Sequence, residues 1–321
     1  MAQIVLGVGT SHGPQITMPP ETWQLLYDKD TTDSRIDYKA LLAKAQAEGR
    51  DLTPELTPEV WRDRHAACHV ALGSLRKKLE AAAPDVMVVV GDDQHEQFLD
   101  DNMPMFSVFY GSTLAMHRRE RESAAGWQRA EALAHPVIPP EAAVETSLAG
   151  HLIDALRDAD FDVACSNKLN ERVGLGHAFT FVYRYLDPSG SIPMVPVAVN
   201  TFFPPNQPTP KRCYALGRAL RSAIEGWPSD KRVAVIASGG LSHTILEEDL
   251  DRAVLDALAE KDVDALCSLP ADRLTRGTSE IRNWVTLAGA MERESMTLID
   301  YVPCYRTPAS TGCAMAFAYW E

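Results

Sequence analysis

Short, uninterrupted apolar runs rich in β-branched residues limit most strongly what this chain can fold into. The clearest run is residues 86–90, with the sequence VMVVV. Similar runs occupy residues 4–8, 192–199, 233–237, 297–302 and 314–319. Apolar runs without polar alternation are typical of strands covered on both faces, as in the sheets of α/β proteins. The runs therefore predict a sheet with helices on both sides.

Helical patterns separate these runs. Thr57 and Pro58 form a helix start signal, and the apolar residues that follow recur every three or four positions: Trp61, Cys68, Leu72, Leu75 and Leu79. Further helices are predicted at residues 144–157, 211–225, 247–266 and 280–294. The proline-rich segment 201–210 is predicted to be a rigid loop, because proline has no N–H donor.

We predict an α/β fold with a central mixed sheet flanked by helices and a metal site at the carboxyl edge of the strands. No linker or repeat divides the sequence, so residues 1–321 are expected to form a single catalytic domain. Residues 19–84 are expected to be a helical insertion that covers the active site.

Charge and composition exclude several functions. The chain has 31 Lys and Arg against 44 Asp and Glu, a net charge of −13, which argues against nucleic-acid binding. No apolar run approaches the ~20 residues of a membrane helix. The six cysteines are spread singly, which argues against a zinc-thiolate site and is typical of reduced thiols. We expect a cytoplasmic protein with no membrane or nucleic-acid partner.

Three histidines follow predicted strands. His12 lies in TSHGP after the first strand, His95 in GDDQHE after residues 86–90, and His243 in SGGLSH after residues 233–237. Ligands of open α/β sheets bind beyond the carboxyl ends of the strands. The three histidines are therefore expected at one edge of the sheet.

A carboxylate completes this pattern. Thr278 or Ser279 is predicted to cap a helix whose first turn contains Glu280, where the helix dipole favours an ionised side chain. One carboxylate with two imidazoles is the facial set that binds non-heme Fe(II) and leaves coordination positions open. His12, His95 and Glu280 are the predicted ligands, and Asp92 or Asp93 could replace His95 or Glu280.

The remaining histidines give weaker signals. His177 follows Gly174 and Gly176, and these glycines permit an unusual backbone that could hold an active-site loop. Three other histidines lie in charged or proline-bounded surroundings and are expected to face solvent: His117, His135 and His151.

Together the motifs resemble a known family. They are GTSHGP at 9–14, the DDQH turn at 92–95, Gly176-His177, PPNQPTP at 204–210, SGGLSH at 238–243 and EIRNW at 280–284. In this order they resemble the class III extradiol ring-cleavage dioxygenases, nearest to the β-subunit superfamily of protocatechuate 4,5-dioxygenase with its gallate and 3-O-methylgallate dioxygenase relatives. The resemblance implies that His12, His95 and Glu280 bind Fe(II). It also implies that His243 is the catalytic acid and base and that His177 is a second polar partner.

The implied reaction is ring cleavage of a catecholic aromatic acid with O₂ as co-substrate. We expect a lignin-derived methoxylated or trihydroxy benzoate such as 3-O-methylgallate or gallate, with a biaryl catechol as the alternative. Thr10, Ser11 and Asn206 are candidates to hold the carboxylate by hydrogen bonds. Four cationic side chains are further candidates: Arg276, Arg282, Lys168 and Arg184.

Two other functions fit the same residues. Memo-type proteins resemble this fold and would act as binding modules, and a zinc-dependent hydrolase would also use three ligands and an open position. The family resemblance also makes a homodimer plausible. Either a separate small subunit or the 19–84 insertion is expected to close the active site.

Overall fold

The structure is a computed structural model that describes residues 1–116 and 126–321. Within these residues, nine strands form one mixed sheet. The order across the sheet is β10 (Met296–Tyr305), β11 (Thr311–Trp320), β1 (Gln3–Thr10), β8 (Arg232–Ser238), β2 (Val86–Asp92), β7 (Met194–Val199), β3 (Phe106–Phe109) and β6 (Ala164–Ser166). The short strand β9 (His243–Ile245) pairs with β11. The predicted α/β class with a central mixed sheet is confirmed.

The centre of the sheet is parallel. β1 pairs with β8, β8 with β2 and β2 with β7 in parallel register, whereas β11 runs antiparallel to β1 and β3 runs antiparallel to β7. Thr10 at the end of β1 lies opposite Ser238 at the end of β8. The chain segments that leave β1, β8 and β2 therefore start side by side at one edge.

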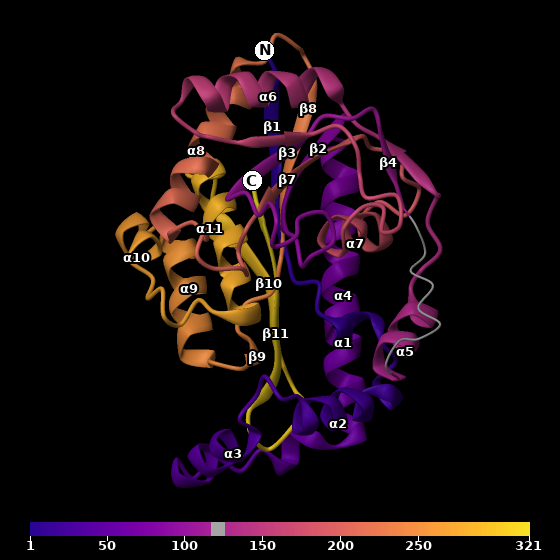
Figure 1. Ribbon diagram of the computed structural model, residues 1–321, viewed down its shortest axis with the longest axis vertical. Coiled ribbons are helices and arrows are strands. Elements are labelled where there is room, and N and C mark those ends of the chain that lie inside the picture. The colour runs from indigo at the N-terminus through magenta and orange to yellow at the C-terminus, as the bar shows by residue number, and fades with distance from the viewer. Residues whose placement is uncertain (117–125) are drawn as a thin grey trace.

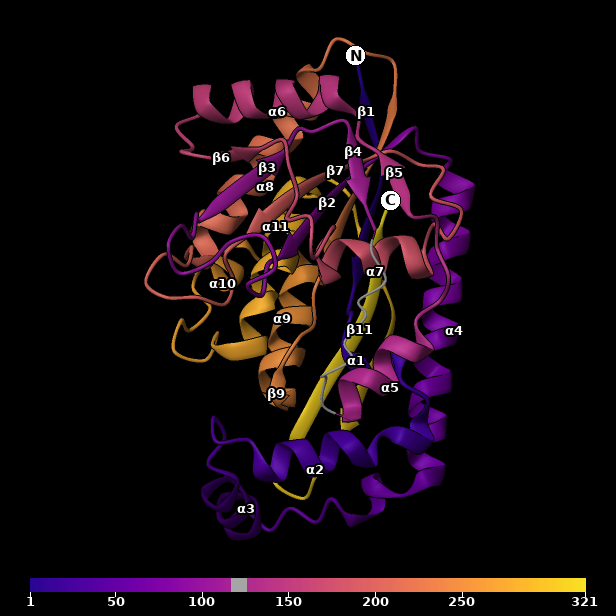
Figure 2. The same ribbon diagram turned by 45° about the vertical axis from the view of Figure 1, so that its right-hand side comes forward.

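Helices cover both faces of the sheet (Figures 1 and 2). One face carries α8 (Pro210–Gly226) and α11 (Ile281–Ala290), with α9 (Glu248–Glu260) and α10 (Val263–Cys267) beside them. The other face carries α4 (Pro58–Ala82) and α7 (His177–Tyr185). The helix α6 (Thr146–Asp158) lies near the N-terminal end of β1.

Smaller elements surround this framework. The short helix α1 (Pro14–Thr17) follows β1, and α2 (Gln24–Thr32) and α3 (Tyr38–Ala47) lie at the end of the molecule opposite α6. The helix α5 (Gly126–Ala134) lies beside α1 and α2. The remaining elements are the strand pair β4 (Thr113–Ala115) and β5 (Glu141–Ala143) and the 3₁₀ helices η1 (Pro20–Thr22), η2 (Thr53–Leu56) and η3 (Arg276–Glu280).

The predicted strands and most predicted helices are confirmed. The start of α4 is as predicted, because Thr57 Oγ1 accepts a hydrogen bond from the Val60 N–H at 3.3 Å. The single helix predicted at 247–266 was wrong: it divides into α9 and α10 at Lys261, whose φ is 58°. Segment 201–210 contains no helix or strand before Pro210, as expected for the proline-rich loop.

Close packing fixes the position of α11. A Cβ atom built on Gly217 of α8 would lie 1.9 Å from the backbone oxygen of Thr286 in α11, so only glycine fits there. Trp284 Nε1 donates to the Gly239 carbonyl at 2.8 Å, and Asn283 Nδ2 donates to the Ser238 carbonyl at 3.0 Å. The N-terminal end of α11 is therefore held against the carboxyl end of β8.

Residues 19–84 form η1, α2, α3, η2 and α4. This segment touches η3, because Arg276 Nη2 donates to the Arg35 carbonyl at 2.6 Å. Its role as a cover for the active site stays a prediction. Among the helices described, none has the length and apolar character needed to cross a membrane.

Candidate metal centre

His12 follows β1 and points one ring nitrogen into the protein interior. Ser238 Oγ donates to the Ala178 carbonyl at 2.6 Å, so this hydroxyl accepts a hydrogen bond from His12 Nδ1 at 3.0 Å. The proton therefore resides on Nδ1, and Nε2 keeps its lone pair. Among the described residues, the buried Nε2 atom has no hydrogen-bond partner.

Asp92 is the last residue of β2 and is fully buried. Its Oδ1 atom lies 3.8 Å from His12 Nε2 and also lacks a hydrogen-bond partner within the described chain. Burial, followed by the nearby Glu280 carboxylate, raises the pKa of Asp92. Two buried polar atoms without partners carry a large desolvation cost, which a cation placed between them would offset.

His177 is the first residue of α7 and faces the same cluster. Its Nδ1 atom lies 2.9 Å from Glu96 Oε2, and Glu96 also accepts the backbone N–H of His177 at 3.0 Å. A carboxylate bonded to Nδ1 fixes the orientation of the ring and leaves Nε2 facing the cluster, as is usual for metal-binding histidines. His177 Nε2 lies 3.8 Å from Asp92 Oδ2.

His12, Asp92 and His177 together form a candidate metal centre. Each offers one ligand atom, and these three atoms all lie within 4.8 Å of one another. The three side chains come from the ends of β1 and β2 and from the start of α7. The lone pair of His12 Nε2 and the Oδ1 atom of Asp92 make no hydrogen bond with the described residues. Both are donors that suit a divalent transition metal.

Glu280 lies on the other side of His12. It is the last residue of η3, and its Oε2 atom lies 3.3 Å from His12 Nε2 while accepting the Gly240 N–H at 2.7 Å. Burial alone would raise the pKa of Glu280, but the adjacent His243 lowers it well below the ordinary value. Glu280 is therefore an ionised carboxylate at the edge of the cluster.

His243 begins β9 and is held at both ring nitrogens. Nδ1 donates to the Leu241 carbonyl at 2.8 Å, and Nε2 lies 3.2 Å from Glu280 Oε1. A Cβ atom on Gly277 would lie 1.9 Å from the His243 ring, so the glycine makes room for it. Burial opposes protonation of His243, but the Glu280 carboxylate raises its pKa well above the ordinary value.

The predicted cap of the helix at Glu280 was wrong. Thr278 and Ser279 lie within η3 and do not cap α11. Thr278 Oγ1 instead bonds both backbone groups of His243, accepting from its N–H at 3.1 Å and donating to its carbonyl at 2.9 Å. This hydroxyl therefore links η3 to β9 and helps to hold Glu280 and His243 together.

The structure does not bring His95 to the other predicted ligands. His95 has a φ of 59°, its ring stacks on Phe203 with centroids 3.8 Å apart, and its Nε2 atom lies 3.2 Å from Asp100 Oδ1. The chain turns after Asp92, so the histidine three residues later faces away from the cluster. The residue that β2 delivers to His12 is Asp92.

Asp93 is occupied in the same turn. Its carboxylate accepts the backbone N–H groups of Glu96, Gln97 and Phe98 at 3.1, 2.8 and 3.2 Å. Gln94, which the sequence analysis did not single out, donates from Nε2 to both Asp92 Oδ2 and Glu280 Oε1 at 3.3 Å. Gln94 thus bridges two carboxylates at the mouth of the site.

The predicted substrate-binding side chains have partners within the protein. Thr10 Oγ1 donates to the Ser11 carbonyl at 3.1 Å, and Ser11 Oγ accepts the Ala316 N–H at 2.9 Å. Asn206 Nδ2 donates to the Met103 carbonyl at 3.1 Å. The buried Arg282 guanidinium donates to backbone carbonyls, among them Pro208 at 2.8 Å and Leu274 at 2.9 Å. Their roles in substrate binding stay predictions.

Three histidines differ from the sequence prediction. His177 lies in a helix rather than in a loop. His135 and His151 do not simply face solvent, since His135 Nε2 lies 3.1 Å from Arg184 Nη1 and His151 Nε2 lies 2.9 Å from the Ala223 carbonyl. His117 lies outside the described residues.

Comparison with known proteins assigns the chain to a family. The model of a family described as the catalytic LigB subunit of aromatic ring-opening dioxygenase matches residues 7–315. The chain belongs to this family. The resemblance to class III extradiol dioxygenases that the sequence motifs indicated is confirmed.

Several relatives share part of the sequence. A gallate dioxygenase of Pseudomonas putida is 34% identical over 143 residues, which cover 40% of this chain and 39% of the relative. A 2,3-dihydroxyphenylpropionate/2,3-dihydroxicinnamic acid 1,2-dioxygenase of Comamonas testosteroni is 29% identical over 181 residues, 56% of this chain and 50% of the relative. The enzyme of that name from Cupriavidus necator is 26% identical over 297 residues, 75% of this chain and 84% of the relative.

Proposed function

We propose that this chain is an Fe(II)-dependent extradiol dioxygenase that opens the ring of a catecholic aromatic acid with O₂. One observation carries the proposal: His12 Nε2 and Asp92 Oδ1 are buried, lack hydrogen-bond partners among the described residues and face each other at 3.8 Å. A cation between these two atoms would satisfy both of them. The site lies at the carboxyl edge of the parallel strands. The chain also belongs to a family of catalytic subunits of ring-opening dioxygenases.

We propose that the metal ion is held among His12, Asp92 and His177, with Asp92 in the place that the sequence suggested for His95. Glu280 is close enough to complete the set, because its Oε2 atom is 3.3 Å from His12 Nε2. Imidazole and carboxylate donors suit Fe(II). Bound Fe(II) would supply a Lewis acid that activates the catechol and O₂.

His243 is the proposed acid and base. Its Nδ1–H is committed to the Leu241 carbonyl, so Nε2 is the nitrogen that exchanges protons with the site. Glu280 Oε1, 3.2 Å away, stabilises the protonated ring. In this arrangement His243 accepts a proton from a catechol hydroxyl and later returns one as the ring opens, which is the task of a positioned general acid–base.

The proposed substrate is a lignin-derived methoxylated or trihydroxy benzoate such as 3-O-methylgallate or gallate. The relatives named for gallate and for dihydroxyphenylpropionate support an aromatic acid with adjacent hydroxyls. The net charge of −13 works against any anionic substrate at long range. The attraction must therefore come from groups close to the candidate metal centre.

Oxygen uptake with defined metals tests this function. The metal-free protein is reconstituted without oxygen with Fe(II) or with Zn(II), and oxygen consumption is then followed with gallate, 3-O-methylgallate, protocatechuate and a biaryl catechol. We expect uptake only with Fe(II) and fastest with a benzoate. Fe(II) protein that consumes no oxygen with any catechol would contradict the proposal, and tight Zn(II) binding with esterase or amidase activity would favour the hydrolase.

A further inference from the structure

A cavity extends from the candidate metal centre along α7. Two of the candidate metal ligands, His12 and His177, line this cavity together with Thr180, Phe181 and Arg184. His177, Phe181 and Arg184 are spaced four and three residues apart, so they share one face of the helix. Seven residues of helix rise about 10 Å, and helical side chains lean back toward the N-terminus, so Arg184 extends toward the metal end.

Arg184 forms no close ion pair among the described residues, and the nearest acidic side chain in its cavity is Glu131. Its side chain is largely buried, and its Nε atom is buried without a hydrogen-bond partner in the described chain. Arg184 Nη1 donates to His135 Nε2 at 3.1 Å, and this imidazole is neutral when it accepts. Burial lowers the pKa of Arg184, partly offset by Tyr185 and by Glu131 of the same cavity.

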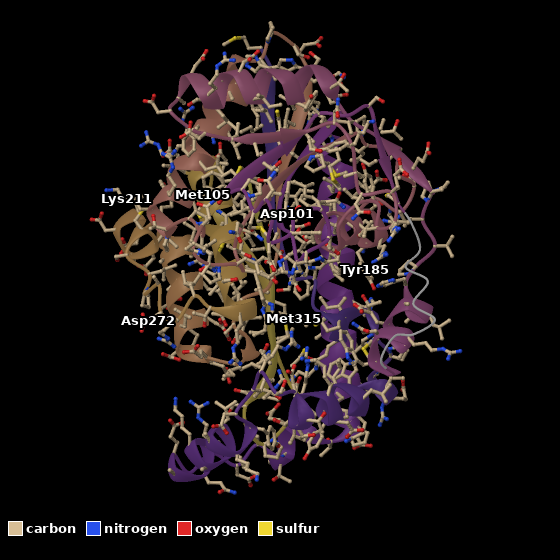
Figure 3. The ribbon with its side chains drawn as sticks, viewed as in Figure 1. Asp101, Met105, Tyr185, Lys211, Asp272 and Met315 are labelled. Carbon is tan, nitrogen blue, oxygen red and sulfur yellow. The ribbon has the colours of Figure 1, made fainter. Side chains whose placement is uncertain are left out.

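Contacts of Tyr185 hold the C-terminal end of α7 in place. Tyr185, the residue after Arg184, is labelled in Figure 3 near α4 and α7. Its hydroxyl donates to Thr17 Oγ1 at 3.1 Å, and its ring lies 4.6 Å from the Phe181 ring between centroids. The C-terminal end of α7 is thus anchored to α1, which keeps Arg184 in the wall of the cavity.

We propose that Arg184 binds the carboxylate of the aromatic acid whose catechol oxygens face the candidate metal centre, so that this residue determines the preference for acids over neutral catechols. The statement that the catechol oxygens face the candidate metal centre rests on the proposed function. A guanidinium binds a carboxylate through two parallel hydrogen bonds, and the buried Nε–H of Arg184, which lacks a partner among the described residues, is free to donate one of them. Arg282, another of the four candidate cations from the sequence, instead donates to backbone carbonyls.

Arg184→Met tests the assignment, because methionine keeps much of the apolar length and removes the charge. Binding of protocatechuate and of unsubstituted catechol to the Fe(II) protein is measured without oxygen, and kcat and KM are measured with oxygen. We expect Arg184→Met to weaken protocatechuate binding about 10- to 100-fold and catechol binding less than about 3-fold. Arg184→Lys keeps the charge but loses the two parallel hydrogen bonds of the guanidinium. Its affinity for protocatechuate is expected to lie between those of the unchanged protein and Arg184→Met. The control is Arg62→Met, an exposed arginine that pairs with Glu59 on α4.

A second arm does not depend on ring cleavage. Calorimetry with benzoate and with neutral benzamide measures the carboxylate contribution on the Fe(II) protein, and benzoate affinity is expected to fall in Arg184→Met while benzamide affinity stays constant. Equal effects on acid and neutral ligands, or no effect on either, would overturn the role of Arg184. If benzoate binding depends on Arg184 but no catechol is cleaved, the proposed function fails and the carboxylate site stands. If Arg184→Met does not fold, Arg184→Lys decides: protocatechuate and catechol affinities that fall equally would refute the assignment.

Discussion

At the scale of single residues, the candidate metal centre depends on which polar side chain of the turn after β2 faces inward. The sequence offers Asp92, Asp93, Gln94 and His95 in succession. A pattern of residue types cannot tell which of four adjacent side chains enters the site, because that depends on the turn. Here Asp92 still belongs to the strand, whereas His95 adopts a left-handed backbone and stacks on Phe203.

Replacing Asp92 and His95 separately tests this assignment. We expect Asp92→Ala to lower Fe(II) affinity at least about 10-fold, because a carboxylate donor is lost from the cluster. We expect His95→Ala, the matched control, to bind Fe(II) as the unchanged protein does. Metal content after anaerobic loading and desalting measures both. Loss of iron in His95→Ala with retention in Asp92→Ala would restore the ligand set predicted from the sequence.

Replacing His243 separates proton transfer from metal binding. His243 is not among the three clustered donors, and its Nε2 atom faces Glu280. We expect His243→Gln to keep bound Fe(II) and to reduce kcat about 10²- to 10⁴-fold, the usual contribution of a general acid–base. Iron content and steady-state turnover are measured on the same preparation. Turnover at the unchanged rate would remove His243 from the catalytic groups.

At the scale of elements, apolar runs identified the central strands and periodic patterns identified α4, α6 and α8, because those elements bury a continuous face. The helix α7 was missed. It has nine residues, six of them buried, and follows a glycine-rich turn, so it is too short for a helical period to stand out from the surrounding apolar residues. For that reason the sequence indicated only that the glycines before His177 could hold an active-site loop.

The contact between α8 and α11 positions Glu280, and a single glycine permits it. We expect Gly217→Ala to lower the free energy of unfolding by about 1–3 kcal/mol, because the added methyl group meets the Thr286 carbonyl at 1.9 Å. Gly73→Ala is the control: Gly73 lies in α4 with no atom within 4 Å of an added Cβ, and alanine should raise stability by about 0.5–1 kcal/mol. Denaturant unfolding measures both, and equal stability of the two variants would contradict this packing.

At the scale of the whole molecule, the site exists because three parallel strands end side by side. The sequence predicted that His12 and His243 would meet at one edge, since both follow strands, and the structure places β1 next to β8. The order of the strands and the face on which α7 packs arise from contacts between distant segments, which no local pattern contains. Glu96, which orients His177 across 81 positions, is one such contact.

The central claim is that His12, Asp92 and His177 hold a metal for ring cleavage in which both atoms of O₂ enter the product. Isotopically labelled O₂ tests it most directly. The Fe(II) protein and its Asp92→Ala variant are given a catecholic benzoate under labelled O₂, and the product is analysed by mass spectrometry. We predict a ring-opened product with two labelled oxygen atoms from the unchanged protein and little product from the variant. An unlabelled product, or equal amounts of labelled product from both proteins, would contradict the account.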